Sequence, residues 1–307
     1  MTTTSLRPTA VLALPLTVDS AAWATPIDEE LRLWINHPGA GETAQLRVLR
    51  GNAFEALSSL PIVAAGAARC GSEIVMTGAD AEGHPVVLGV AEDGNVRWRF
   101  LIDGPTPIRW PIPGCAPEPV VVWQTSHGEI ERARVGPQGL DRRRSVRVGG
   151  PPLDLTTGGA AIWAVWSDES GVHAVEMGRE RAREIFINAA VPDGVAVGGF
   201  EEGAWVAWTR GASAFLVSVS PGKHPSAPVA IDIAGASGGT LAVVAGSEPL
   251  LWIRHGEALE GEPPRWRSAF VLPGREPTLV EGLVHAVTWW GDAVAVVGTT
   301  DVRLFER

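Results

Sequence analysis

Residues 153–188 read LDLTTGGAAIWAVWSDESGVHAVEMGRERAREIFIN. Four short hydrophobic segments alternate with turns in this stretch, at 153–157, 161–167, 171–177 and 184–188. The connections hold Gly158, Asp168 and Gly171, which are the residue types that tight β-turns require. Four short strands joined by tight turns predict one antiparallel sheet, in which each strand pairs with the next.

The second segment of this unit recurs along the whole chain. Its apolar centre recurs as Leu31–Trp34, Glu73–Met76, Val120–Trp123, Trp163–Trp166, Trp205–Trp208, Ala242–Ala245 and Val294–Val297. Successive copies end 42, 47, 43, 42, 37 and 52 residues apart. A repeat of about 40 to 50 residues built from short strands is typical of a β-propeller blade.

The repeats predict an all-β chain with one domain at 1–307, a seven-bladed propeller of four-stranded antiparallel blades. The expected blades are 17–61, 62–104, 105–149, 150–190, 191–233, 234–275, and 276–307 with 9–16. The last repeat has only three strands and ends near Phe305, whereas Val11–Leu14 at the other end has no sheet of its own. We therefore expect the N-terminal strand to pair with the C-terminal blade, because this closure removes an open edge.

Charge and hydropathy exclude two classes of partner. The chain has 25 basic and 35 acidic side chains, a net charge of −10, which repels the nucleic-acid backbone. No apolar stretch is long enough to span a membrane. Residues 10–24 resemble a weak signal peptide, but the ring needs residues 9–16 as a strand, so a cytoplasmic protein is expected. The oligomeric state is left open, with a monomer favoured.

Cys70 and Cys115 are too few for a disulfide scaffold. Both fall in the turn between the first and second strands of consecutive repeats. We expect reduced thiols, the alternative being a bridge between two blades.

Enzyme motifs are sparse. Gly235–Gly239 matches G-x-S-x-G, but that motif works between a strand and a helix, and here it falls between two strands. The chain has no tyrosine, which excludes the sialidase chemistry that uses a tyrosine nucleophile. We expect no cofactor and no bound metal.

Arginines gather on the strands expected at the outer edge of the blades, including Arg97–Arg99 and Arg265–Arg267. The densest group spans the third and fourth repeats and comprises Arg142, Arg143, Arg144, Arg147, Arg179, Arg181 and Arg183. Charges on an edge strand prevent pairing with other sheets. The alternative is a rim on which an acidic partner docks.

Two sets of residues are expected near the central channel of the propeller, where ligands bind. The tryptophans Trp23, Trp110, Trp289 and Trp290 fall on inner strands and would suit a sugar face or a peptide. The carboxylates Asp103, Asp154, Asp193 and Asp232 fall where the chain crosses from one blade to the next. Their alternative role is to cap turns, and their uneven spacing argues against a metal site.

The repeat resembles bacterial WD40-like and YVTN-type seven-bladed propellers in length, four-strand rhythm and closure. The Gly-His and Trp-Asp signatures of WD40 repeats are missing, so the resemblance is one of architecture and carries no function with it. The leading hypothesis is a non-enzymatic scaffold that binds a protein or peptide. The alternatives are a propeller that binds a small ligand or carbohydrate through inner-strand tryptophans, and a lyase or lactonase with a metal in the channel.

Overall fold

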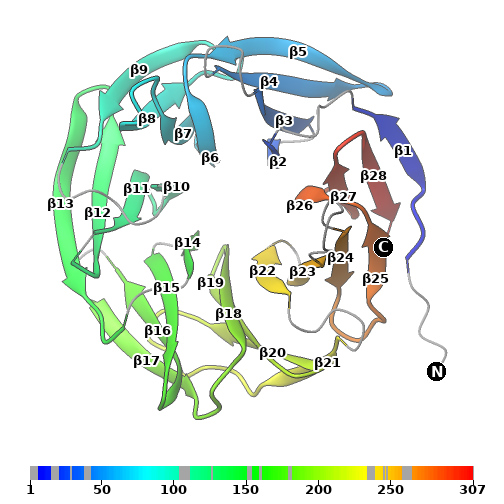
Figure 1. Cartoon of the computed structure of the whole chain (residues 1–307). Helices are drawn as coiled ribbons and strands as arrows, with labels where there is room; N and C mark the ends of the chain where they lie inside the picture. The colour runs from blue at the N-terminus through cyan, green and yellow to red at the C-terminus, as the bar shows by residue number, and fades with distance from the viewer. Residues whose placement is uncertain are drawn as a thin grey trace. The chain divides into compact units, whose positions relative to one another are not determined.

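The computed structural model describes residues 6–14, 21–27, 30–37, 43–103, 111–125, 127–150, 154–158, 161–178, 182–233, 239–244, 246, 248–257 and 265–306. Every helix or strand assigned within these ranges is a β-strand. The strands form seven antiparallel sheets of four strands each, labelled in Figure 1. The fold class predicted from the repeats is therefore confirmed.

Three sheets come from the first half of the chain, and each follows the chain order of its strands. The first contains β2 (Ala21–Ile27), β3 (Glu30–His37), β4 (Thr43–Arg50) and β5 (Ala53–Leu60). The second contains β6 (Val63–Cys70), β7 (Glu73–Ala79), β8 (Pro85–Val90) and β9 (Val96–Leu101). The third contains β10 (Ile112–Cys115), β11 (Pro119–Gln124), β12 (Glu129–Gly136) and β13 (Gly139–Arg147).

Three further sheets follow in the same order. The fourth contains β14 (Asp154–Gly158), β15 (Ala161–Asp168), β16 (Gly171–Met177) and β17 (Ala182–Asn188). The fifth contains β18 (Gly194–Phe200), β19 (Gly203–Arg210), β20 (Ser213–Val219) and β21 (Val229–Asp232). The sixth contains β22 (Thr240–Val244), β23 (Leu250–Glu257), β24 (Arg265–Val271) and β25 (Thr278–Glu281).

The last sheet joins the two ends of the chain. Its strand order is β1-β28-β27-β26, from β1 (Ala10–Ala13), β26 (Val284–Trp290), β27 (Ala293–Gly298) and β28 (Asp301–Glu306). The N–H of Thr9 donates to the carbonyl oxygen of Leu304 at 2.7 Å just before β1 begins. The N-terminal strand thus supplies the fourth strand of the final blade, as predicted.

The sixth blade differs from its sequence prediction. Ala242 lies on β22, the first strand, whereas the apolar second strand is β23 and begins at Leu250. A repeat that ends at Ile253 lies 45 residues after Trp208 and 44 before Val297, which restores the regular spacing. The sixth blade therefore extends past residue 275 to include β25, and Arg265–Arg267 lies on the third strand instead of the fourth.

Large apolar side chains fill the spaces between neighbouring sheets. Trp163 on β15 and Trp208 on β19 are buried in one cluster that joins the fourth and fifth sheets. The first strands of these two sheets, β14 and β18, approach so closely that a Cβ on Gly199 would meet the carbonyl oxygen of Thr157. Glycine is required at this position because there is no room for a side chain.

The chain divides into two compact units, one of residues 12–151 and the other of residues 1–11 with 152–307. Within the described ranges there is no helix of the length and apolarity that crossing a membrane requires.

Candidate functional site

The arginine group predicted at the outer edge begins on β13, the fourth strand of the third blade. Arg143, Arg144 and Arg147 are exposed, and the guanidinium of Arg143 lies 5.6 Å from the centre of the buried Trp123 ring. Among the described residues these three arginines have no ion pair. Arg142 lies on the same strand, but its side chain is outside the described part.

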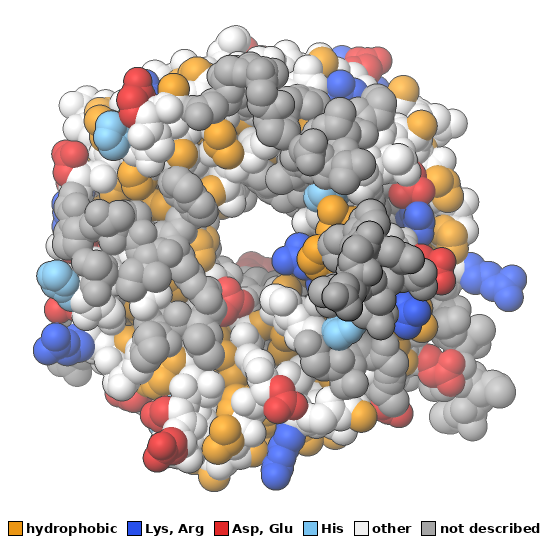
Figure 2. All heavy atoms as spheres, in the orientation of Figure 1, with side chains coloured by type: hydrophobic (Ala, Val, Ile, Leu, Met, Phe, Trp, Pro, Cys, Tyr) orange, Lys and Arg blue, Asp and Glu red, His pale blue; other side chains and the backbone are white. Residues whose placement is uncertain are grey.

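The other members of this group lie on the fourth blade. Arg179 and Arg181 are outside the described residues. Arg183 lies on β17 and donates to the carbonyl oxygen of Lys223 at 3.2 Å, which fixes it against the neighbouring fifth blade. On the face that Figure 2 shows, the described Lys and Arg side chains stay apart and do not form one basic patch.

Two of the predicted carboxylates bind backbone N–H groups. Asp154 begins β14 and accepts from the N–H groups of Leu155 and Val197, both at 2.9 Å. The contact to Val197 joins the first strands of the fourth and fifth blades. Asp193 precedes β18 and accepts from the N–H of Gly211 at 2.7 Å. Asp193 therefore caps a turn, which was the alternative to a ligand site, whereas Asp154 links two neighbouring blades.

The other two carboxylates lie at the opposite end of the crossing between blades. Asp103 follows β9 and Asp232 ends β21, and each of these is the fourth strand of its sheet. Both residues are exposed. Asp232 thus lies on an outer strand and not near an inner one as predicted, so Asp193 and Asp232 are not at equivalent positions of their blades.

The predicted tryptophans lie in different environments. Trp110 and the side chain of Trp23 are outside the described residues, so the apolar patch that would include them stays a prediction. Trp289 is only 6% exposed and packs in the core between the sixth and seventh blades. Its indole N–H donates to the carbonyl oxygen of Glu248 at 3.0 Å. Trp290, the last residue of β26, is half-buried.

The turn between β15 and β16 contains a Ser, a His and an Asp in contact. The hydroxyl of Ser170 donates to Asp168 at 2.6 Å and lies 2.8 Å from Nε2 of His173. The same Nε2 lies 3.2 Å from the Asp168 carboxylate, whereas a catalytic triad uses the two ring nitrogens for different partners. The side-chain and backbone hydrogen bonds from Ser170 lower the pKa of Asp168 to about 2. This cluster stabilises a turn and does not have the arrangement of a nucleophilic site.

A second cluster lies in the turn between β7 and β8, where Asp80, Glu82 and His84 have ligand-type atoms within 4.8 Å of one another. The Asp80 carboxylate already accepts from the N–H of His84 at 2.8 Å and from Arg99 at 3.1 Å. Burial opposes ionisation of Asp80, but the N–H groups and charges around it lower its pKa. The Asp80 carboxylate, which would be the central metal ligand, is thus already held by a backbone N–H group and an arginine.

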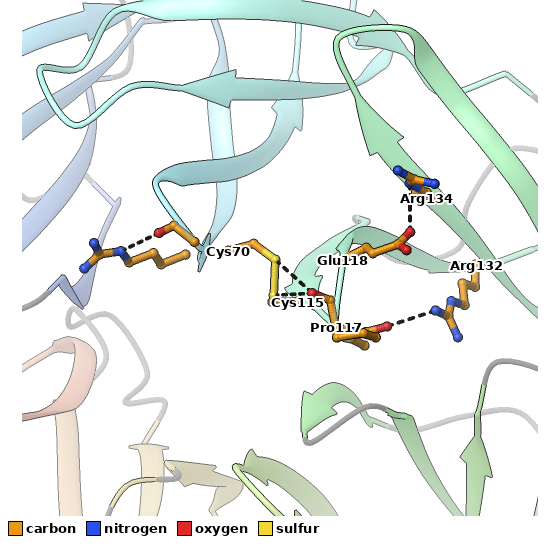
Figure 3. Close-up of a disulfide and its surroundings, with 9 residues drawn as sticks. Cys70, Cys115, Pro117, Glu118, Arg132 and Arg134 are labelled. Carbon is orange, nitrogen blue, oxygen red and sulfur yellow. Dashed lines mark hydrogen bonds and ion pairs between the residues drawn. A yellow bond between two sulfur atoms is a disulfide. The ribbon is translucent and has the colours of Figure 1, made fainter.

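The cysteines form a disulfide, which overturns the prediction of reduced thiols. Cys70 ends β6 and Cys115 ends β10, the first strands of the second and third blades, and their Cα atoms are 5.2 Å apart. Figure 3 shows the bridge between the two turns. The thiols meet because equivalent turns of neighbouring blades lie side by side. Recurrence of Cys at the same turn was the sequence signal for this alternative.

Arginines stabilise both turns beside the bridge (Figure 3). Arg69 donates to the carbonyl oxygen of Gly71 at 2.8 Å, and Arg132 donates to that of Ala116 at 3.1 Å. An ion pair between Glu118 and Arg134 at 2.8 Å joins the turn that holds Cys115 to the third strand of the third blade. The bridge therefore connects two turns that have their own local contacts.

No protein-family model matches the chain, and no curated protein matches it in sequence. Solved structures do match. The Pan2 WD40 domain of Neurospora crassa is similar over 99% of this chain and 96% of its own, with a TM-score of 0.59 and 10% identity. This chain is a seven-bladed β-propeller. The architectural resemblance to WD40 propellers that the repeats indicate is confirmed.

Other solved propellers agree with this assignment. The RRP9 WD40 repeats match over 99% of this chain and 100% of their own, with a TM-score of 0.61 and 11% identity. YCF48, solved bound to a D1 peptide, matches over 100% of both chains with a TM-score of 0.58 and 14% identity. At these identities the likeness establishes the fold alone.

Proposed function

We propose that this propeller is a non-enzymatic scaffold that binds an acidic protein or peptide through the fourth strand of its third blade. The observation that carries the proposal is the row of exposed arginines on β13, namely Arg143, Arg144 and Arg147, which have no ion pair among the described residues. The strand pairs only with β12, so its other edge is free in its sheet. Unpaired cations beside a free edge suit an acidic segment.

Edge protection is the competing explanation of these charges. Edge protection predicts that these arginines can be replaced without loss of partner binding. Two similar propellers were solved with partners, YCF48 with a D1 peptide and BBS1N with ARL6DN, which supports partner binding by this fold. The docking explanation predicts that partner binding depends on the arginines, and edge protection predicts that it does not.

The test replaces Arg143, Arg144 and Arg147 together with Ser and measures recovery of partners from source-cell extract at several salt concentrations. A cross-linker then maps the contact surface. We expect recovery to fall and its salt dependence to weaken, with the melting temperature nearly unchanged, because exposed charges contribute little to stability. The matched control is Arg97→Ser, an exposed arginine on the fourth strand of the second blade. Equal recovery by the triple variant and the control would refute the proposal.

The other two functions have less support. A lectin propeller, SapL1 with alpha methyl fucoside, is similar with a TM-score of 0.51 and 10% identity. However, Trp289 is buried and so offers no ring to a sugar. For a lyase, the channel carboxylates would have to bind a metal, but Asp154 and Asp193 accept from backbone N–H groups.

The disulfide bears on where such a scaffold works. Disulfides persist in oxidising compartments and are rare in the cytosol. The Cys70–Cys115 bridge therefore weighs against the cytoplasmic location predicted from the sequence.

A further inference from the structure

The Cys70–Cys115 bridge lies where a dissolved thiol can reach it. Both cysteines are half-buried, and the contacts that their sulfur atoms make are solvent-exposed. The neighbouring turn residues Gly71, Ser72 and Pro117 are exposed. Disulfides with structural roles resist reduction by thiols, whereas exposed ones are the labile bridges that have regulatory or catalytic roles. The position of this bridge at the surface therefore favours a role in redox chemistry.

A backbone carbonyl beside the bridge offers a partner to the reduced cysteines. The carbonyl oxygen of Pro117 lies 3.5 Å from Sγ of Cys115 and 3.8 Å from Sγ of Cys70, as Figure 3 shows. A disulfide sulfur has no proton, so neither contact is a hydrogen bond in the oxidised protein. After reduction, one of the two thiols can donate to this carbonyl, because an S–H group is a weak donor. The same geometry thus accommodates both redox states.

Each turn keeps its shape by contacts that do not involve sulfur. Arg69 donates to the carbonyl oxygen of Gly71 at 2.8 Å in the first turn. In the second turn, the N–H of Ala116 donates to the carbonyl oxygen of Glu118 at 3.0 Å, and Arg132 donates to that of Ala116 at 3.1 Å. Cleavage of the S–S bond removes none of these hydrogen bonds. We therefore expect both turns to stay folded when the bridge is reduced.

The second and third blades also pack together without the bridge. The hydroxyl of Thr77, on β7, donates to the carbonyl oxygen of Pro111, just before β10, at 2.6 Å, and this contact is buried. Trp98 of the second blade and Trp123 of the third are buried in one apolar cluster. These contacts hold the two blades together, so reduction of the bridge does not require that the blades separate.

We propose that Cys70 and Cys115 form a redox site that a dithiol reduces while both blades stay folded. One thiolate of the dithiol attacks Sγ of one cysteine and forms a mixed disulfide. The Cys70–Cys115 bond breaks, and the other cysteine leaves as a thiolate that takes up a proton. The second thiol of the reductant then attacks the sulfur of its own molecule in the mixed disulfide and releases the first cysteine. In sum, two electrons and two protons pass from the dithiol to the protein, and the dithiol becomes a disulfide.

The consequence of this exchange is local. The oxidised site ties the ends of β6 and β10 covalently, whereas the reduced site leaves the two turns to open independently, each at its own free energy. The redox state of the surroundings thus sets how firmly the second and third blades are tied at this end. The site is independent of the docking proposed for β13.

The test treats the folded wild type with dithiothreitol at several concentrations, stops the reaction with iodoacetamide and counts alkylated cysteines by intact mass. We expect two alkylated cysteines and a rate proportional to the reductant concentration, because direct attack by a thiolate is a second-order reaction. The near-ultraviolet circular dichroism should stay native. Hydrogen exchange should become faster at 70–73 and 115–118 and stay slow in β7 and β11. Oxidised glutathione should then restore the bridge.

The matched control is Leu12→Ala, which weakens the packing of β1 and leaves both turns unchanged. Its bridge should be reduced at the wild-type rate to within about twofold, since direct attack does not depend on unfolding. Reduction that required global unfolding would instead be faster by about tenfold or more in this variant. Such an increase, or a rate that does not depend on the reductant concentration, would overturn the proposal.

The single variants Cys70→Ser and Cys115→Ser test access to each sulfur without the bridge. Each leaves one thiol in the chain, and we expect at least one of the two thiols to react with a chromogenic aromatic disulfide in the absence of denaturant. If both thiols react only in denaturant, the sulfurs are shielded and the redox site is excluded. Loss of the native circular dichroism on reduction of the wild type would likewise show that the bridge is purely structural.

Discussion

Removal of the Cys70–Cys115 bridge should destabilise the propeller by a calculable amount. The two cysteines are 45 residues apart in sequence, and their Cα atoms are 5.2 Å apart in the folded chain. The turns that carry them have their own hydrogen bonds, so we expect the folded state to change little without the bridge. The effect then comes from the unfolded chain, where closing a loop of this length is worth about 4 kcal/mol.

The assay compares melting temperatures of the wild type and the Cys70→Ser/Cys115→Ser double variant, each with and without a phosphine reductant. A loss of this size should lower the melting temperature by about 6 °C in a chain of this length. Reductant should lower the wild type to the level of the variant and leave the variant unchanged. Two titratable thiols in the unreduced native protein, with a melting temperature that does not respond to reductant, would refute the bridge and this reasoning.

Three further predictions concern stability. Leu12→Ala should lower the free energy of unfolding by about 2 to 4 kcal/mol in denaturant unfolding, because Leu12 is a buried residue of β1. The control Val11→Ala should change it by no more than about 0.5 kcal/mol, since Val11 is exposed. Equal effects of the two variants would contradict the closing role of β1. Asp168 has a folded pKa of about 2, below its ordinary 3.8, so its contribution is present above pH 4 and is lost as the pH falls toward 2. An Asp168→Asn variant should therefore show a smaller fall in melting temperature between pH 4 and pH 2, and an unchanged fall would contradict this. Gly199→Ala should destabilise the protein by more than about 3 kcal/mol, because the new Cβ would meet the backbone of Thr157. Gly211→Ala should cost only about 1 to 2 kcal/mol, because its Cβ would have no atom within 4 Å and only the φ of +59° is unfavourable. Unfolding curves of similar midpoint for the two variants would contradict the close approach of β14 and β18.

Seven blades and the closing strand were predictable because hydrophobic period and turn residues are local properties of the sequence. The fourth repeat shows this well, since its strands at β14 to β17 match the expected ones to within about two residues. The sixth repeat shows the limit. Ala242–Ala245 and Leu250–Ile253 are both apolar runs, and only strand pairing distinguishes the first strand from the second. This error also put Trp266 and Arg267 on the wrong strand.

The candidate sites depended on contacts that no local pattern contains. Asp154 lies at the start of β14 and Asp193 just before β18, but what their carboxylates bind is decided by the N–H groups that other segments bring near, such as that of Val197.

Sequence alone determined the repeat unit, the number of blades and the role of the N-terminal strand, because these follow from hydrophobic alternation and turn chemistry along the chain. Tertiary structure alone decided that Cys70 and Cys115 are bonded, that Trp289 is core, and that Asp154 accepts from the N–H of Val197. The physical reason is that pairing and burial depend on distances between residues far apart in sequence, which are set only when neighbouring blades pack.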